Sequence, residues 1–173
     1  MSSIRTGIFE FRGADAPVVG PDIRVGQQAP EFTAHGMDWS VVKGLESTQR
    51  KVRIIGSLPS LSTSVCDRET RRFNQEAAAL GEDIVIMVVS MDLPYTLKNW
   101  CGAAGVERVV TLSDHTGGEF GEKYGVLLKD QRILRRAIFV VDRQGKVVYA
   151  DYMAKLGDEP IYEDVLAAAK AAL

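Results

Sequence analysis

The sequence has few cysteines, no long apolar run and no surplus of charge of one sign. Its 21 Lys and Arg nearly balance its 23 Asp and Glu, which leaves a formal net charge of −2. Arginines cluster only at 68–72 and 132–136, so we do not expect nucleic-acid binding. No apolar run reaches the roughly 18 residues of a membrane span, and the first residues lack the apolar core of a signal peptide. We therefore expect a cytoplasmic protein that binds neither nucleic acid nor membranes.

The two cysteines and two histidines also limit the chemistry. Because the cytoplasm keeps thiols reduced, a transient or catalytic disulfide is favoured over a permanent structural one. A zinc site made of Cys66, Cys101, His35 and His115 would have no recognised ligand spacing. A Cys-x-x-Cys reductase motif is absent, because the residues three positions before and after Cys66 are Thr and Glu. A cysteine hydrolase would need one of the two histidines as its base.

The chain contains enough apolar material for one core. Of the 173 residues, 46% are hydrophobic and 25% are charged, which is typical of a soluble domain with one core. We therefore interpret residues 1–173 as a single globular domain. Residues 5–11 and 18–25 are β-rich, and the connector at 13–17 is rich in turn-forming residues. This pattern predicts an N-terminal β-hairpin extension over residues 1–25.

From residue 52 onward, predicted strands and helices alternate. Two runs with adjacent apolar residues, 52–57 and 84–90, indicate neighbouring strands that are buried on both faces. We predict further strands at 32–34, 109–112, 137–141 and 147–152, and helices at 65–80, 94–105, 118–124 and 159–173. This order indicates an α/β fold, with a final hairpin that makes the sheet mixed.

Residues 59–66, Pro-Ser-Leu-Ser-Thr-Ser-Val-Cys, join the first predicted core strand to a helix. Cys66 lies in the first helical turn, where unpaired backbone N–H groups and the helix dipole stabilise a thiolate. Pro59 restricts the loop by locking φ, and the Thr63 hydroxyl can both cap the helix and hydrogen-bond a sulfur atom or its substrate. Cys66 is therefore a candidate nucleophile, although free cysteines are often inert and buried.

These residues resemble a known family. Pro59, Thr63 and Cys66 match the peroxiredoxin pattern Pro-x-x-x-Thr-x-x-Cys. Ser-Met-Asp-Leu-Pro-Tyr at 90–95 and Trp-Cys-Gly-Ala at 100–103 resemble the segment with the resolving cysteine in the thiol peroxidase subfamily, the atypical 2-Cys peroxiredoxins.

The resemblance runs from Gly-Gln-Gln-Ala-Pro at 26–30 to the C-terminal helix. Ser62 departs from it, because the subfamily usually has Asp there, and this difference concerns a loop contact rather than the chemistry. The resemblance implies a thioredoxin-like fold, with a central mixed sheet flanked by helices. Periodicity alone supports only the α/β class.

The resemblance also implies a reaction. Cys66 would be the peroxidatic residue, attacking hydrogen peroxide or an organic hydroperoxide and becoming a sulfenic acid. Cys101 would be the resolving residue, forming an intramolecular Cys66–Cys101 disulfide that thioredoxin reduces. The family needs no metal or organic cofactor, and its thiol peroxidases are usually homodimers.

A cation beside Cys66 is also expected. The charges of Asp67 and Glu69 in the first turn would oppose thiolate formation. Arg136 stands where peroxiredoxins place a strand arginine beside the sulfur. Its guanidinium would stabilise the thiolate and donate hydrogen bonds to the peroxide. Arg135 is its competitor, and only one of the two can serve because strand neighbours point to opposite faces.

Three alternatives stay open. Cys101 could be a packing residue, which would make the protein a one-Cys peroxidase. A non-enzymatic redox-sensing or binding module on the same fold is a second possibility, because fold does not determine function. The loop at 124–135, rich in Leu and Ile, either forms a hydrophobic wall for alkyl hydroperoxides or simply packs against the sheet.

Overall fold

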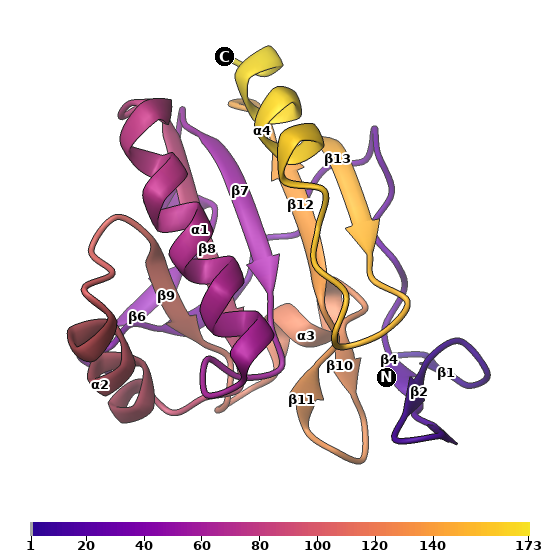
Figure 1. Ribbon diagram of the computed structural model, residues 1–173. Helices are drawn as coiled ribbons and strands as arrows, with labels where there is room; N and C mark the ends of the chain where they lie inside the picture. The colour runs from indigo at the N-terminus through magenta and orange to yellow at the C-terminus, as the bar shows by residue number, and fades with distance from the viewer. Residues whose placement is uncertain (1) are drawn as a thin grey trace.

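The computed structural model describes residues 2–173 and is organised around a seven-stranded sheet (Figure 1). The strand order is β13-β12-β7-β8-β9-β5-β6. Three central strands are parallel: β7 (Val52–Ser57), β8 (Ile84–Ser90) and β9 (Val110–Ser113). The others pair antiparallel: β12 (Ala137–Val141) and β13 (Val147–Tyr152) on one side, and β5 (Thr33–His35) and β6 (Val41–Lys43) on the other. The predicted mixed sheet is therefore confirmed.

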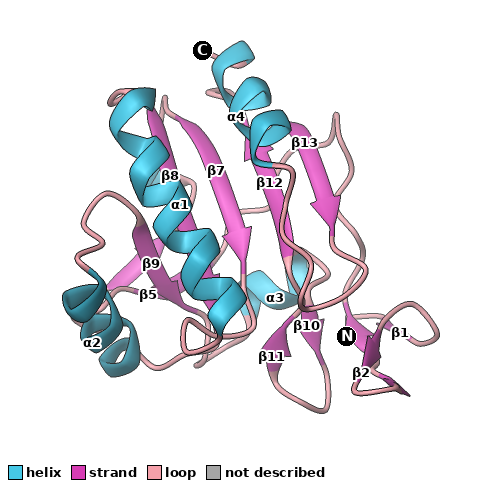
Figure 2. Ribbon diagram, viewed as in Figure 1, coloured by secondary structure: helices cyan, strands magenta, loops and turns pink. Residues whose placement is uncertain are grey.

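Helices cover both faces of this sheet (Figure 2). The helices α1 (Ser64–Leu80), α2 (Pro94–Ala104) and α4 (Tyr162–Ala171) share one core with Ile54 of β7. The short α3 (Glu119–Lys123) packs on the opposite face, in the core that contains Ile55. Since strand neighbours alternate between faces, these two adjacent isoleucines serve different cores.

Most predicted boundaries from residue 52 onward are confirmed. The predicted strands 52–57, 84–90, 137–141 and 147–152 match the observed ones. Pro94 begins α2, and Gly105 ends it in the left-handed conformation with φ +65°. The C-terminal helix begins at Tyr162, later than predicted, because a residue preceding proline, here Glu159 before Pro160, is disfavoured in a helix.

The N-terminal hairpin is shorter and more broken than predicted. The strand β1 (Ile4–Arg5) pairs with β4 (Val18–Val19), and β2 (Glu10–Phe11) pairs with β3 (Ala14–Asp15). Positive φ angles at Gly7 (+70°) and Gly20 (+83°) interrupt the two β-rich runs. The prediction relied on the β propensity of the two runs and overlooked that these glycines would end the strands.

A second sheet lies at the end of the molecule where α1 begins (Figure 1). In it β4 pairs with β10 (Leu127–Leu128), and β10 pairs with β11 (Ile133–Leu134). Both strands lie in the segment 124–135, for which the sequence predicted only a loop. The N-terminal extension is thus attached to the domain by backbone hydrogen bonds.

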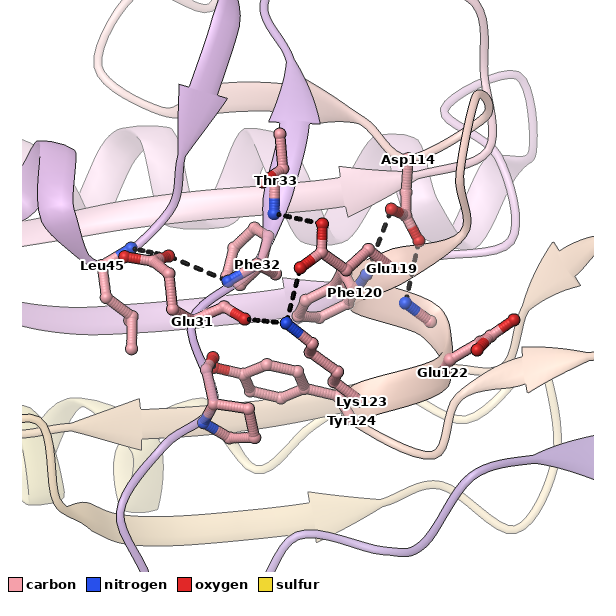
Figure 3. Close-up of polar contacts among 12 residues, drawn as sticks. Glu31, Phe32, Thr33, Leu45, Asp114, Glu119, Phe120, Glu122, Lys123 and Tyr124 are labelled. Carbon is pink, nitrogen blue, oxygen red and sulfur yellow. Dashed lines mark hydrogen bonds and ion pairs between the residues drawn. The ribbon is translucent and has the colours of Figure 1, made fainter. Parts of the chain in front are cut away.

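Polar contacts attach the irregular segment after residue 26 to α3 (Figure 3). The Glu31 carboxylate accepts a hydrogen bond from Leu45 N at 2.8 Å. Lys123 Nζ donates to Glu31 O at 2.8 Å and also to Glu119, whose carboxylate accepts from Thr33 N at 3.1 Å. These contacts hold β5 beside the short helix.

Candidate active site

Cys66 lies in the first turn of α1 and its side chain is fully buried. Thr63 occupies the N-cap position with extended backbone angles, but its hydroxyl does not cap a helix N–H. Thr63 Oγ1 instead lies 2.8 Å from Cys66 Sγ and 2.9 Å from Ser60 O. A hydroxyl has one proton, so it donates to the sulfur when Cys66 is a thiolate. The predicted cap is therefore wrong, because the sulfur and Ser60 O take the hydroxyl.

Arg136 precedes β12 and reaches the same sulfur atom. Its Nη2 donates to Cys66 Sγ at 3.1 Å, while Nε and Nη2 donate to Leu156 O at 3.2 and 3.0 Å. Its Nη1 donates to the Glu69 carboxylate. Arg136 is only 1% exposed, so its guanidinium is held by three protein partners, Leu156 O, Glu69 and Cys66 Sγ, rather than by water. A fixed cationic donor, Arg136 Nη2, therefore faces the thiol.

Glu69 is a site residue whose role the sequence reasoning missed. It is fully buried and lies one helical turn after Cys66, on the same face of α1. Burial raises the pKa of Glu69 to about 7, against the lowering effect of Arg136. Burial also tends to lower the pKa of Arg136, but the charges of Glu69 and Cys66 raise it above its ordinary value. Glu69 was expected to oppose the thiolate, whereas it is an ion-pair partner of Arg136.

Arg135 points to the other side of the sheet. Its Nε donates to Gly125 O at 3.0 Å, and its guanidinium lies 4.2 Å from the centroid of the Tyr152 ring. It also forms an ion pair with Asp22. Adjacent residues alternate between faces, so Arg135 ties the N-terminal segment to the sheet, away from Cys66.

The loop that precedes α1 is held by Asp92, a second residue that the sequence reasoning missed. The Asp92 carboxylate accepts hydrogen bonds from Ser60 Oγ at 2.7 Å, from Leu61 N at 2.8 Å and from Ser90 Oγ at 2.9 Å. Ser62, where the resemblance departs, forms hydrogen bonds with Ser60 Oγ at 3.2 Å, through both its hydroxyl and its backbone N–H. Asp92 lies two residues before α2, so one carboxylate links the Cys66 loop to the start of the Cys101 helix.

A cavity of about 1060 Å³ opens beside Pro59 and Thr63. Its other walls are the N-terminal hairpin at 7–15, the loop at 154–157 and Ile133. Of the segment 124–135, only Ile133 reaches the cavity, because Leu127, Leu128 and Leu134 are buried in the cores. Ordinary packing therefore explains most of that segment, and the hydrophobic-wall interpretation is wrong for all but Ile133.

Cys101 lies on α2 and is buried, with Sγ 3.4 Å from Thr111 Oγ1 of β9. Burial raises the pKa of its thiol, partly offset by the Thr111 hydroxyl. Both cysteines are free thiols. The sulfur of Cys101 faces β9 and that of Cys66 faces the start of β12, strands separated by three inter-strand steps or roughly 14 Å. The structure therefore does not bring the two thiols together.

The two histidines lie apart from the cysteines, with ring centroids 6.1 Å from each other. His115 Nδ1 lies 2.9 Å from Ser113 Oγ, and His35 Nδ1 lies 3.5 Å from Thr116 Oγ1. Among residues 2–173, no group of three or more His, Cys, Asp or Glu is arranged to hold a metal ion. Within the same residues, no helix is long and apolar enough to cross a membrane.

Comparisons with known proteins agree on one family. The Redoxin family model matches residues 24–166. The chain is 47% identical over 161 residues to the thiol peroxidase of Bacillus subtilis, covering 93% of this chain and 95% of that protein. It is 45% identical over 156 residues to the thiol peroxidase of Oceanobacillus iheyensis, covering 90% and 94%.

Solved structures show the same fold. The crystal structure of a peroxiredoxin-like protein from Aquifex aeolicus superimposes with a TM-score of 0.85 at 34% identity, covering 99% of both chains. The thiol peroxidase from Chromobacterium violaceum gives a TM-score of 0.81 at 23% identity, covering 94% of this chain and 95% of the other. The predicted thioredoxin-like fold is thereby confirmed.

Proposed function

Because this chain belongs to the Redoxin family and is a peroxiredoxin-type thiol peroxidase, we propose that Cys66 is its peroxidatic residue. The observation that supports this most directly is the convergence of two donors on one sulfur. Thr63 Oγ1 lies 2.8 Å and Arg136 Nη2 lies 3.1 Å from Cys66 Sγ. Donors fixed around a reacting atom lower a barrier by orientation and by stabilising developing charge.

In the first step, the Cys66 thiolate attacks one oxygen of a hydroperoxide. The O–O bond breaks, the sulfur gains an oxygen, and the departing alkoxide or hydroxide takes up a proton to become an alcohol or water. Thr63 and Arg136 align the O–O bond and stabilise the charge that moves to the leaving oxygen. Pro59 keeps the loop rigid at the mouth of the cavity through which the hydroperoxide enters.

In the second step, the Cys101 thiol attacks the Cys66 sulfenic acid. A Cys66–Cys101 disulfide forms and water leaves. We propose that thioredoxin then reduces this disulfide, that no metal or organic cofactor takes part, and that the protein acts as a cytoplasmic homodimer. The one-Cys alternative differs only in this step, because an external thiol would then reduce the sulfenic acid directly.

The test is a coupled assay with thioredoxin, thioredoxin reductase and NADPH, started with hydrogen peroxide or an organic hydroperoxide. We expect peroxide-dependent NADPH oxidation by the wild type and none by Cys66→Ser, because a serine hydroxyl without an adjacent base is a poor nucleophile. Cys101→Ser should still consume one equivalent of peroxide but should not turn over with thioredoxin. Turnover by Cys66→Ser would exclude Cys66 as the nucleophile. Full turnover by Cys101→Ser would favour the one-Cys alternative, and no turnover by the wild type would exclude thioredoxin as the reductant.

A further inference from the structure

A polar cluster ties the helix of Cys66 to the helix of Cys101. Asp67, Arg71 and Asn74 lie along one face of α1 at helical spacing. Trp100 Nε1 donates to Asp67 Oδ1 at 3.0 Å, and Arg71 Nη1 donates to Ala104 O, the last residue of α2, at 3.1 Å. We call these five residues the α1–α2 clasp.

The residues of the clasp also contact one another. Arg71 Nε donates to Asp67 Oδ2 at 2.9 Å, and the Arg71 guanidinium lies 5.7 Å from the centroid of the Trp100 ring. The Asn74 amide oxygen accepts hydrogen bonds from the backbone N–H groups of Glu107 (3.2 Å) and Arg108 (2.9 Å), just beyond α2. The second half of α2 is therefore held to α1 by side chains as well as by apolar packing.

The clasp lies directly beside the two cysteines in sequence. Asp67 follows Cys66 and Trp100 precedes Cys101, so their hydrogen bond joins the immediate neighbours of the two cysteines. The thiols themselves face Arg136, just before β12, and Thr111 of β9, a strand three steps away from β12. A disulfide requires Cα atoms within roughly 7 Å of each other. At least one of the two helices must therefore unwind before the bond can form, and unwinding the turn of α2 that contains Trp100 breaks its hydrogen bond to α1.

We propose that the α1–α2 clasp sets the lifetime of the Cys66 sulfenic acid by holding α2 closed. This inference rests on the proposed function. The sulfenic acid has two fates: it condenses with the Cys101 thiol to a disulfide and water, or a second hydroperoxide oxidises it to sulfinic acid and is itself reduced to an alcohol or water. Stronger clasp contacts slow the condensation with Cys101 and leave the oxidation to sulfinic acid unchanged. The clasp thus determines how much hydroperoxide the enzyme tolerates before it is over-oxidised.

The chain offers a matched pair of arginines for the test. Arg71 and Arg72 are both 45% exposed, and each pairs with a carboxylate four residues away, Asp67 at 2.9 Å and Glu76 at 2.8 Å. Each also lies over an aromatic ring, but the ring for Arg72 is Tyr162 of α4. Arg71→Gln therefore weakens the clasp, while Arg72→Gln removes an equivalent contact that does not involve α2.

The experiment adds one equivalent of hydrogen peroxide to the reduced protein, quenches with a thiol-alkylating reagent and resolves sulfenic acid, disulfide and sulfinic acid by intact mass. In Arg71→Gln and Trp100→Phe we expect disulfide formation to accelerate about five- to tenfold, the effect of losing one or two partly exposed hydrogen bonds. In a separate titration with excess hydrogen peroxide, in the presence of thioredoxin, thioredoxin reductase and NADPH, the peroxide concentration that converts half of Cys66 to sulfinic acid should rise by a similar factor. The rate of sulfenic acid formation should not change, and Arg72→Gln should match the wild type.

Equal rates of disulfide formation in the wild type and both clasp variants would overturn the proposal, as would an equal acceleration in Arg72→Gln. Two variants on different helices guard against a fold defect in one, since a loss of structure would also lower the rate of the first step. If the wild type forms no sulfenic acid or no disulfide with one equivalent of peroxide, the proposed function itself fails. The two failures therefore give different results.

Discussion

At the scale of single residues, the site is an electrostatic arrangement around one sulfur atom. Cys66, Glu69 and Arg136 are each 1% exposed or less, so their charges interact with little screening by water. Arg136 has a negative partner on each side: the Glu69 carboxylate, and Cys66 when it is a thiolate. Removing one member of a buried ion pair leaves an unpaired charge, which is strongly destabilising. Glu69 therefore holds Arg136 in the orientation that Cys66 needs.

Arg136→Ala is the residue-scale prediction. We expect the second-order rate constant of Cys66 with hydrogen peroxide to fall by about 10²- to 10³-fold, because a donor fixed beside the reacting atoms is lost. Single-turnover peroxide consumption measures this directly. Arg132→Ala is the control, because it removes an exposed positive charge that is not a hydrogen-bond partner of the sulfur. An Arg136→Ala rate within twofold of the control would exclude a role for this arginine in the first step.

At the scale of elements, the chemistry depends on where two helices begin and end. The helix α1 begins one residue after Thr63, which places Cys66 in its first turn. The helix α2 has Pro94 at its start and Gly105 at its end, and it is only 11 residues long. Short helices open at low free-energy cost, since few buried contacts hold them. A helix of this kind is suited to a cysteine that must move.

The element-scale prediction compares amide hydrogen exchange in the reduced and disulfide forms. We expect lower protection in the oxidised protein over residues 63–70 and 95–105, because the cysteines cannot meet while both helices keep their present turns. The buried strand β8 serves as the internal control and should be equally protected in both forms. Equal protection everywhere, with a Cys66–Cys101 bond shown by mass mapping, would mean that no unwinding is required.

At the scale of the whole molecule, the two faces of the sheet carry different groups. The helices α1, α2 and α4 cover one face, and α1 and α2 carry the two cysteines, Cys66 and Cys101. The opposite face holds α3, and there Asp114 accepts hydrogen bonds from Phe120 N at 3.1 Å and Gly121 N at 2.8 Å. Asp114 is almost fully buried, at 2% exposed. Burial raises the pKa of Asp114 to about 6, only partly offset by the two backbone donors.

This shift predicts a pH dependence of global stability. Because the pKa of Asp114 is higher in the folded than in the unfolded protein, the folded state binds more protons between pH 4 and pH 6. The stabilisation is fully present below about pH 4 and is lost as the pH rises through about 6. We expect this group to lower the free energy of unfolding by on the order of 3 kcal/mol across that interval.

Urea unfolding at pH 4 and pH 7 measures the effect, with Asp114→Asn as the comparison. The asparagine keeps an acceptor for a backbone N–H but does not titrate, so the variant should lose less stability than the wild type over this range. Glu69 titrates in an overlapping range and contributes equally to both proteins. An identical loss of stability in the wild type and the variant would show that Asp114 keeps its ordinary pKa.

Local sequence patterns are enough to predict the central elements of the fold. Adjacent apolar residues such as Ile54 and Ile55 predict strands buried on both faces, since only a covered sheet satisfies both side chains. Pro94 and Gly105 mark the ends of a helix through local backbone geometry. The Pro-x-x-x-Thr-x-x-Cys pattern ending at Cys66 named the candidate nucleophile. All of these signals are local, and neighbours in the chain suffice to express them.

Features that depend on contacts between residues distant in sequence are visible only in the folded protein. Glu69 and Arg136 are 67 residues apart, and nothing in either segment shows that one neutralises the other. The contacts of Asp92 with Ser60 and Leu61, and the pairing of β4 with β10, arise in the same way. Such contacts form because buried polar groups and strand edges must find partners, and the fold determines which partners are within reach.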